Sequence, residues 1–317
     1  MHRGTVKQRT PKLKALLNRG ENAVLDIAES VCAETDTKVF AKVRIADVVQ
    51  IDGSGISNDL YRYALSAHFD VLVAKDNEAF LAIEFDGSGH DPRNDLKKAQ
   101  LCDYFHVPMV RVKENHLQAR VLGDTAVAFL IWQLSCVDAF IEQCGNDPYE
   151  VYDPAFFVRV AGKKGQFPFM YSQRWRGKLA GPLRRVASAL CPQISSVYSY
   201  GLVQFGAVDF AYCRGTEYRC LCAQMLGEDT FVYGEAELGI EVHGLEDDRR
   251  YNFCEIATFV EGMAAEQMHG QVIAFLDGST SNVSSRLNLR AKQAEWEREG
   301  FRLKHAFDSV PEQNHRP

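Results

Sequence analysis

The chain has 317 residues, of which 46% are apolar, 25% charged and 11% aromatic. This composition supplies enough apolar side chains for about two domains and excludes disorder, collagen and coiled coil as the dominant state. The longest apolar run, 126–132, is far shorter than the roughly 20 residues of a bilayer-spanning helix. The N-terminus is charged and lacks an apolar signal segment, so we expect no membrane span and no secretion.

The nine cysteines are an odd number, scattered along a chain that is large enough to fold without disulfides. They favour a reducing, cytoplasmic location. The closest cluster, Cys213, Cys220 and Cys222, lacks the paired C-x-x-C spacing of a zinc ribbon. Buried strand cysteines are therefore the favoured interpretation, with a structural zinc site as the alternative.

Hydrophobic periodicity divides the first half of the chain into helices and strands. In chain order, the expected elements are a helix at 11–33, a strand at 38–49, two strands at 68–74 and 79–85 joined by a polar turn, a helix at 94–105, a strand at 107–112 and a helix at 124–144. This order predicts an α/β or α+β domain in which a helical crossover brings the last strand into the sheet.

A Gly-Asn-Asp-Pro run at 145–148 marks the expected boundary between two domains, 1–145 and 146–317. The second domain is expected to be α+β, with a role in binding nucleic acid or in recognising a partner. Its expected elements are strands at 196–208, 209–212 and 218–225, a helix at 253–269, a strand at 271–276 and a helix at 286–300, followed by a loose tail.

Charge is segregated along the chain. The stretch 154–208 carries eight basic residues, no acid and several aromatic residues, which is the composition of a surface that binds a polyanion such as nucleic acid. In the alternative interpretation, these bases dock within the molecule on the acidic stretch 228–248, which has eight acids and no Lys or Arg. The nucleic-acid-binding candidates are Arg93, Lys163, Lys164, Arg174, Arg176, Lys178, Arg184 and Arg185.

Three acids converge on the predicted hairpin. Side chains two apart on a strand share a face, so Glu84 and Asp86 point together, and Asp70 on the adjacent strand can join them. Clustered carboxylates repel one another unless a cation neutralises them, and oxygen-only ligands suit Mg²⁺ or Mn²⁺. Lys98 or Lys97 of the next helix can supply a cation, and His90 can transfer a proton at neutral pH.

This segment resembles the PD-(D/E)xK phosphodiesterase superfamily, in the branch around very-short-patch-repair endonucleases and their uncharacterised bacterial relatives. The shared residues are Asp70, the Ile-Glu-x-Asp-Gly-x-x-His run ending at His90, the Asp-x-x-Lys ending at Lys98, and the Val-Pro-x-x-Arg-Val strand at 107–112. The likeness spans about residues 16–112 and implies a restriction-endonuclease-like mixed sheet flanked by helices.

The resemblance also implies roles for these residues. Asp70 and Glu84 would bind the metal, and Glu21 resembles the first-helix glutamate that completes the metal site in many such nucleases. Asp86 stands where the superfamily usually has lysine, so His90 and Lys98 would inherit that role. On the residues alone, Asp70, Glu84 and Asp86 are the expected metal ligands.

These observations favour a metal-dependent DNA endonuclease, in a setting of DNA repair, restriction or phage defence that the resemblance alone implies. Because the usual lysine is missing, the alternative is an inactive protein that binds or senses nucleic acid. A third interpretation is an interaction protein whose basic and acidic segments pair between subunits. DNA is the expected partner by resemblance, with RNA, a homodimer and a partner protein left open.

A second acidic pattern alternates strictly along 235–243. Glu235, Glu237, Glu241 and His243 would share one face of a half-buried strand. A solvated sheet face is the favoured interpretation, and a second metal site or a docking patch is the alternative.

Overall fold

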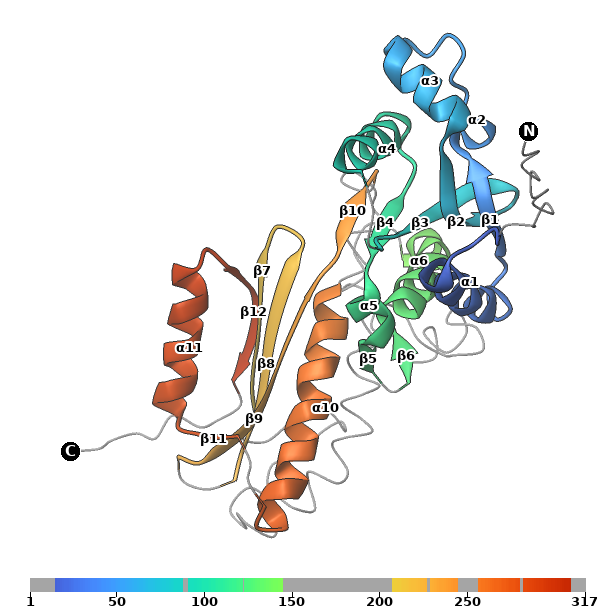
Figure 1. Ribbon diagram of the computed structural model, residues 1–317. Helices are drawn as coiled ribbons and strands as arrows, with labels where there is room; N and C mark the ends of the chain where they lie inside the picture. The colour runs from blue at the N-terminus through green and yellow to red at the C-terminus, as the bar shows by residue number, and fades with distance from the viewer. Residues whose placement is uncertain are drawn as a thin grey trace, which may run out of the picture.

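The computed structural model describes residues 15–87, 91–121, 123–144, 207–226, 229–244, 256–279 and 282–308. Within these ranges lie two five-stranded sheets and the helices that cover them (Figure 1). The α+β class that the sequence predicted is therefore confirmed. No helix in these ranges is long and apolar enough to cross a membrane.

The first sheet has the strand order β1-β2-β3-β4-β10, in which β10 is the short strand Glu241–His243 from the second half of the chain. Strand β2 runs antiparallel to both β1 and β3, and β4 runs parallel to β3 because helix α4 crosses over between them. The elements of this half are α1 (Arg19–Cys32), β1 (Lys38–Arg44), α2 (Ile45–Val48), α3 (Asn58–Ser66), β2 (His68–Lys75), β3 (Glu78–Phe85), α4 (Pro92–Phe105), β4 (Met109–Val112), α5 (Glu114–Gln118), β5 (Arg120–Val121), β6 (Asp124–Thr125) and α6 (Ala126–Cys144).

Two predicted boundaries in this half are wrong. The first helix does not include residues 15–18, because Asn18 and Glu21 form a capping box that starts α1 at Arg19. The strand predicted at 38–49 ends at Arg44, and the next four residues form the short helix α2. The sequence did not predict α3, whose N-cap is Ser57.

Helices cover both faces of the first sheet. On one face, apolar side chains of α1 and α6 pack against Val71, Ile83 and Val110. On the other face, α3 and α4 pack against Ala82 and Met109. Alternate residues of β3 and β4 therefore point to opposite cores, so charged residues on these strands are buried wherever a helix lies above them.

The second sheet has the strand order β11-β9-β8-β7-β12. Its elements are β7 (Ala207–Arg214), β8 (Glu217–Met225), β9 (Phe231–Gly239), α10 (Ile256–Leu276), β11 (Val283–Ser284), α11 (Arg286–Arg298) and β12 (Arg302–Asp308). The predicted strands at 209–212 and 218–225 are confirmed within β7 and β8. The predicted strand at 196–208 lies mostly outside the described residues.

The strand predicted at 271–276 is wrong. These residues continue α10, which passes through Gly270 and ends at Leu276. Residues of α10 such as Ala257, Val260 and Ala264 are fully buried against the second sheet. A helix that is apolar on most sides shows little helical periodicity, and its apolar end resembles a strand in sequence.

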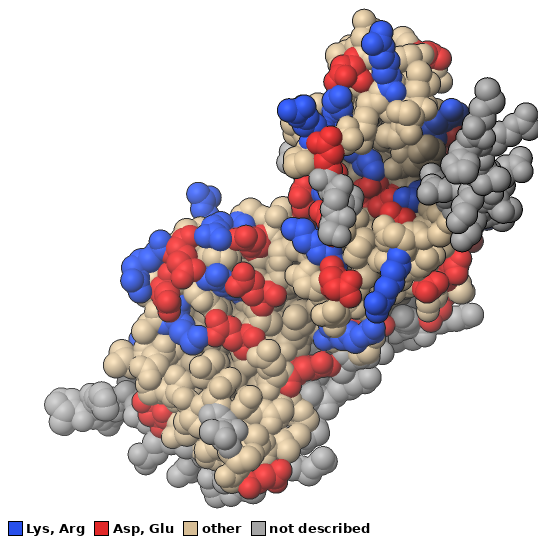
Figure 2. Space-filling model, viewed as in Figure 1, with Lys and Arg blue, Asp and Glu red and all other residues tan. Residues whose placement is uncertain are grey.

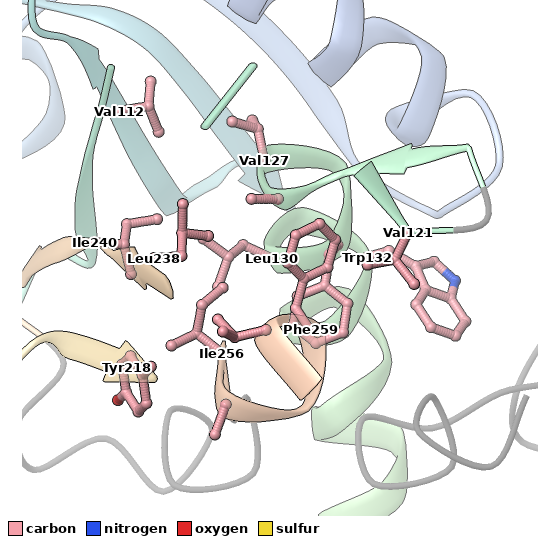
Figure 3. Packing of buried hydrophobic residues seen from close by; sticks show 14 of the residues in the cluster. Val112, Val121, Val127, Leu130, Trp132, Tyr218, Leu238, Ile240, Ile256 and Phe259 are labelled. Atoms are coloured by element: carbon pink, nitrogen blue, oxygen red, sulfur yellow. The ribbon is translucent and has the colours of Figure 1, made fainter. Parts of the chain in front are cut away.

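The described parts of the two halves share one apolar core. Leu130 of α6, Phe259 of α10 and Leu238 of β9 gather in it (Figure 3), and the rings of Phe129 and Phe259 lie 5.3 Å apart. In addition, β10 (Glu241–His243) leaves the end of β9 and pairs antiparallel with β4 at the edge of the first sheet (Figure 1). The domain boundary at 145/146 stays a prediction, since residues 145–206 lie outside the described ranges.

Candidate functional site

Asp70 and Glu84 lie next to each other on the central strands β2 and β3. The Phe85 N–H donates to Asp70 Oδ2 at 3.0 Å, and the Asp70 N–H donates to Glu84 Oε1 at 3.2 Å. Asp70 is 6% exposed and Glu84 is 2% exposed. Each carboxylate is thus fixed by the backbone of the strand that carries the other, which holds the pair in one orientation.

Lys98 of α4 forms an ion pair with Glu84. Its Nζ donates to Glu84 Oε2 at 2.5 Å and to the His68 carbonyl at 2.8 Å. Burial raises the pKa of Glu84 to about 7, the charge of Asp70 adds to the rise, and the Lys98 ammonium opposes it. Of the two lysines that the sequence offered as a cation beside the acids, Lys98 contacts Glu84 directly. Lys97 instead pairs with the exposed Asp59.

A second lysine, Lys42 of β1, belongs to the same cluster, and sequence reasoning missed it. Its Nζ lies 2.6 Å from Asp70 Oδ1 and 3.1 Å from Glu21 Oε1. Burial acts to lower the pKa of Lys42, and the hydrogen bonds to Asp70 and Glu21 outweigh burial, so the pKa is raised. Glu21 of α1 thus contacts the same lysine as Asp70.

Asp86 faces a different partner. Arg111 of β4, only 4% exposed, donates to both carboxylate oxygens of Asp86 at 3.2 Å and 2.6 Å. Asp95 of α4 lies 3.0 Å from the same guanidinium, and Glu241 of β10 lies 4.0 Å from it. The structure therefore joins Asp86 to a buried arginine, a contact that sequence reasoning missed.

The remaining predicted site residues fall into two groups. Arg93 is exposed in the first turn of α4, where it is open to solvent. On the face shown in Figure 2, acidic and basic side chains lie close together over α4 and β10 and again over α11, without a large field of one sign. The others lie outside the described residues: His90, Lys163, Lys164, Arg174, Arg176, Lys178, Arg184 and Arg185.

Two carboxylates are the donor set that this cluster can offer a metal. Among the described residues, no group of three or more His, Cys, Asp or Glu side chains is arranged to hold a metal ion. Asp70 and Glu84 nevertheless fit Mg²⁺, because this ion is commonly bound through one or two carboxylates while keeping several water molecules. Two buried carboxylates that lie close together repel each other and require positive charge nearby. Lys42 and Lys98 supply this charge.

The alternative metal sites of the second half find no support in its geometry. Cys220 and Cys222 are buried and donate to backbone carbonyls of α10. Glu235 and Glu237 pair with Lys292 and Arg219 on the surface of the second sheet. The acidic pattern at 235–243 is divided between two strands, so Glu241 and His243 belong to β10 in the first sheet.

The fold and the site define an α+β protein in which a mixed sheet carries a buried pair of carboxylates flanked by two lysines. Residues 13–125, which span α1 to β6, match a family model described as a protein of unknown function (DUF2726). Searches among curated proteins and among solved structures found no match to this chain.

Proposed function

We propose that this chain is a metal-dependent phosphodiesterase that cleaves DNA, with a restriction-endonuclease-like first sheet of the PD-(D/E)xK type. The observation that carries the proposal is the buried, mutually fixed pair Asp70 and Glu84 on neighbouring central strands. The element order from α1 through β4, with a parallel crossover into β4, agrees with that fold type.

The chain's own residues have distinct parts in this function. Asp70 and Glu84 would hold Mg²⁺ or Mn²⁺, which supplies an activated water and stabilises charge on the phosphate. The Lys98 ammonium opposes the rise in the pKa of Glu84 that burial causes, and its hydrogen bond orients the carboxyl group. The Phe85 N–H orients Asp70, and Glu21 completes the acidic set from α1. His90 is retained as a proton-transfer candidate from the resemblance.

Basic residues would hold the DNA backbone. We assign phosphate binding to the exposed Arg93 and to the basic segment that contains Lys163 and Arg185. Such contacts position the backbone of a nucleic acid and carry no base specificity by themselves. A homodimer or a partner protein would decide between a nick and a double-strand break.

One observation favours a second candidate function, an inactive protein that binds nucleic acid. Asp86 stands where the superfamily usually has lysine, and Arg111 holds both of its carboxylate oxygens. In that case DNA binding needs no divalent ion and weakens steeply as salt increases.

A plasmid cleavage assay separates the two functions. We expect the protein to nick or linearise supercoiled plasmid in Mg²⁺ or Mn²⁺ at low salt, and EDTA to abolish the reaction. Glu84→Gln keeps the size of the side chain but removes the charge and one of the two oxygen acceptors, so we expect cleavage to fall on the order of a hundredfold or more. The matched control is Glu78→Gln, an exposed residue at the start of the same strand, which is expected to cleave normally.

Intact plasmid with a retarded mobility in every lane, with and without metal, would identify the binding protein instead. Cleavage by Glu84→Gln at the wild-type rate would reject the assigned site.

A further inference from the structure

Lys42 has a backbone conformation that a strand residue rarely adopts. Its φ is 54°, in the left-handed region, although it lies inside β1. The other non-glycine residues with positive φ in the described part of the chain are Asp76 and Asn77, in the turn between β2 and β3, and the helix C-cap His106. Those positions favour this conformation, and a strand does not.

The strain is local. The register pairs Ala41 with Val71 and Val43 with Phe69, and the regular ladder is interrupted between them, where Lys42 lies opposite Asp70. A conformation of this kind costs free energy and persists when the surrounding structure imposes it, and such residues concentrate at functional sites. Here the strained residue is the one whose ammonium contacts the acids of the candidate site.

The two lysines of the site differ in their access to solvent. The side chain of Lys98 is 11% exposed and its amine donates to Glu84 and to the His68 carbonyl. The side chain of Lys42 is 32% exposed, and its amine contacts Asp70 and Glu21. An ammonium has three N–H donors, so in the described part of the chain one donor of Lys42 remains for a molecule that arrives from solvent.

We propose that Lys42 contacts the scissile phosphate of the substrate, while Lys98 remains a positioning residue for Glu84. This inference rests on the proposed phosphodiesterase function. A phosphodiester gains negative charge in the transition state, and a preorganised ammonium at the open side of the two acids stabilises it. Lys42 stays protonated throughout, so the step requires no proton from it. The unfavourable φ is then retained because it aims the amine at the substrate.

Substitutions at Lys42 and at Lys38, an exposed residue at the start of the same strand, test the proposal. Lys42→Ala and Lys42→Gly both remove the amine, and we expect plasmid cleavage to fall about a hundredfold in each, the usual cost of one transition-state donor. Lys42→Arg keeps a cation and is expected to recover part of the rate. Lys38→Ala and Lys38→Gly should cleave at the wild-type rate.

Thermal unfolding in EDTA tests the strain separately. Glycine adopts positive φ without a penalty and alanine does not, so Lys42→Gly should unfold at a higher temperature than Lys42→Ala. At Lys38 the order should be reversed, as is normal in a strand. If Lys42→Gly unfolds at a lower temperature than Lys42→Ala, the backbone at this position is not strained and the proposal is wrong.

Binding of a labelled DNA duplex in Ca²⁺, followed by fluorescence anisotropy at several salt concentrations, adds a readout that does not need cleavage. Loss of one phosphate contact should lower the slope of log Kd against log salt by about 0.9 in both Lys42→Ala and Lys42→Gly. If the wild type cleaves and binds DNA and both Lys42 variants do so equally well, the role of Lys42 is rejected and the phosphodiesterase function stands. A wild-type protein that neither cleaves nor binds DNA would overturn the phosphodiesterase function and this inference together.

Discussion

Two hairpins of the molecule carry the same short pattern, an aspartate between apolar residues on the first strand. In β2 the aspartate is Asp70, between Phe69 and Val71, and in β7 it is Asp209, between Val208 and Phe210. Both are buried, at 6% and 1% exposed. The two hairpins differ in what surrounds the aspartate.

Asp70 lies beside a second carboxylate and an ammonium that solvent can reach. Asp209 pairs across the ladder with Cys222 of β8, on the face that α10 covers, where the Cys222 thiol donates to the Glu261 carbonyl. A buried aspartate by itself therefore does not indicate a catalytic or metal-binding site. The mutual hydrogen bonds with Glu84, the contact with Lys42 and the access of Lys42 to solvent together mark the first hairpin as the candidate site.

The comparison is sharpest when both aspartates receive the same substitution. Asp70→Asn removes a proposed metal ligand, and we expect plasmid cleavage to fall on the order of a thousandfold. Asp209→Asn changes a residue closed off by α10, so its effect should be on thermal stability, with the cleavage rate of the folded protein retained. Equal loss of cleavage in the two variants at a temperature where both are folded would mean that the second hairpin also belongs to the site.

Removal of Lys98 tests how much the first hairpin depends on its cation. Lys98→Met leaves Glu84 buried without its partner, and breaking such a pair costs about 3–5 kcal/mol of unfolding free energy. The control is Lys97→Met, which breaks a pair with the exposed Asp59 and should cost less than about 1 kcal/mol.

The cost of Lys98→Met should depend on pH. Because the pKa of Glu84 is raised to about 7, above its ordinary value, the neutral carboxyl is favoured in the folded state, and stability is lost as pH rises through 7. Without Lys98 the ionised form is still less favourable, so the cost should be larger at pH 8 than at pH 5. Urea unfolding in EDTA at the two pH values measures this, and a cost that is the same at both would contradict the assigned role of Lys98.

The sequence predicted the parts of the first hairpin that depend on local periodicity. Ile83 and Phe85 enter one core while Glu84 points to the opposite face, toward α4, as alternation along a strand requires. Asp70 joins Glu84 because a short polar turn places the two strands side by side. Helical periodicity correctly predicted the crossover helix that carries Lys98, and from this helix Lys98 contacts Glu84.

The parts that sequence reasoning missed depend on long-range register. Lys42 meets Asp70 only because β1 pairs with β2 in one particular register, across a gap that contains α2 and α3. Arg111 was quoted as part of a strand motif, yet its role follows from its position opposite Glu84 in the parallel pair β3–β4. Likewise, nothing local indicates that Glu241 leaves the second sheet for the first. Short-range patterns do not carry this information.

His116 allows a finer test of how the two hairpins are linked. It lies in the half that holds the first hairpin and contacts a residue in the half that holds the second. The Lys113 N–H donates to His116 Nδ1 at 2.7 Å, so the ring is neutral and its Nε2 donates to the Gly239 carbonyl at the end of β9, 2.5 Å away. Burial lowers the pKa of His116 although the bond to Gly239 opposes the change. A lowered pKa means that the neutral ring stabilises the fold above its unfolded pKa, and this contribution is lost as pH falls.

His116→Leu removes both the acceptor for the Lys113 N–H and the donor to the Gly239 carbonyl, so we expect it to cost about 1–3 kcal/mol at pH 8. The cost should shrink as pH falls below about 6.5, because the histidine of the unfolded wild-type chain then binds a proton that the buried ring resists, which lowers the stability of the wild type. The exposed His68, substituted in the same way, should show little change at either pH.

Since the bond between His116 and Gly239 joins α5 to β9, its loss should also weaken the coupling between the two sheets. Unfolding followed by tryptophan fluorescence would report this, because Trp132 lies in the shared core and Trp296 in the core of the second sheet. A pH-independent cost would show that the buried ring tolerates protonation.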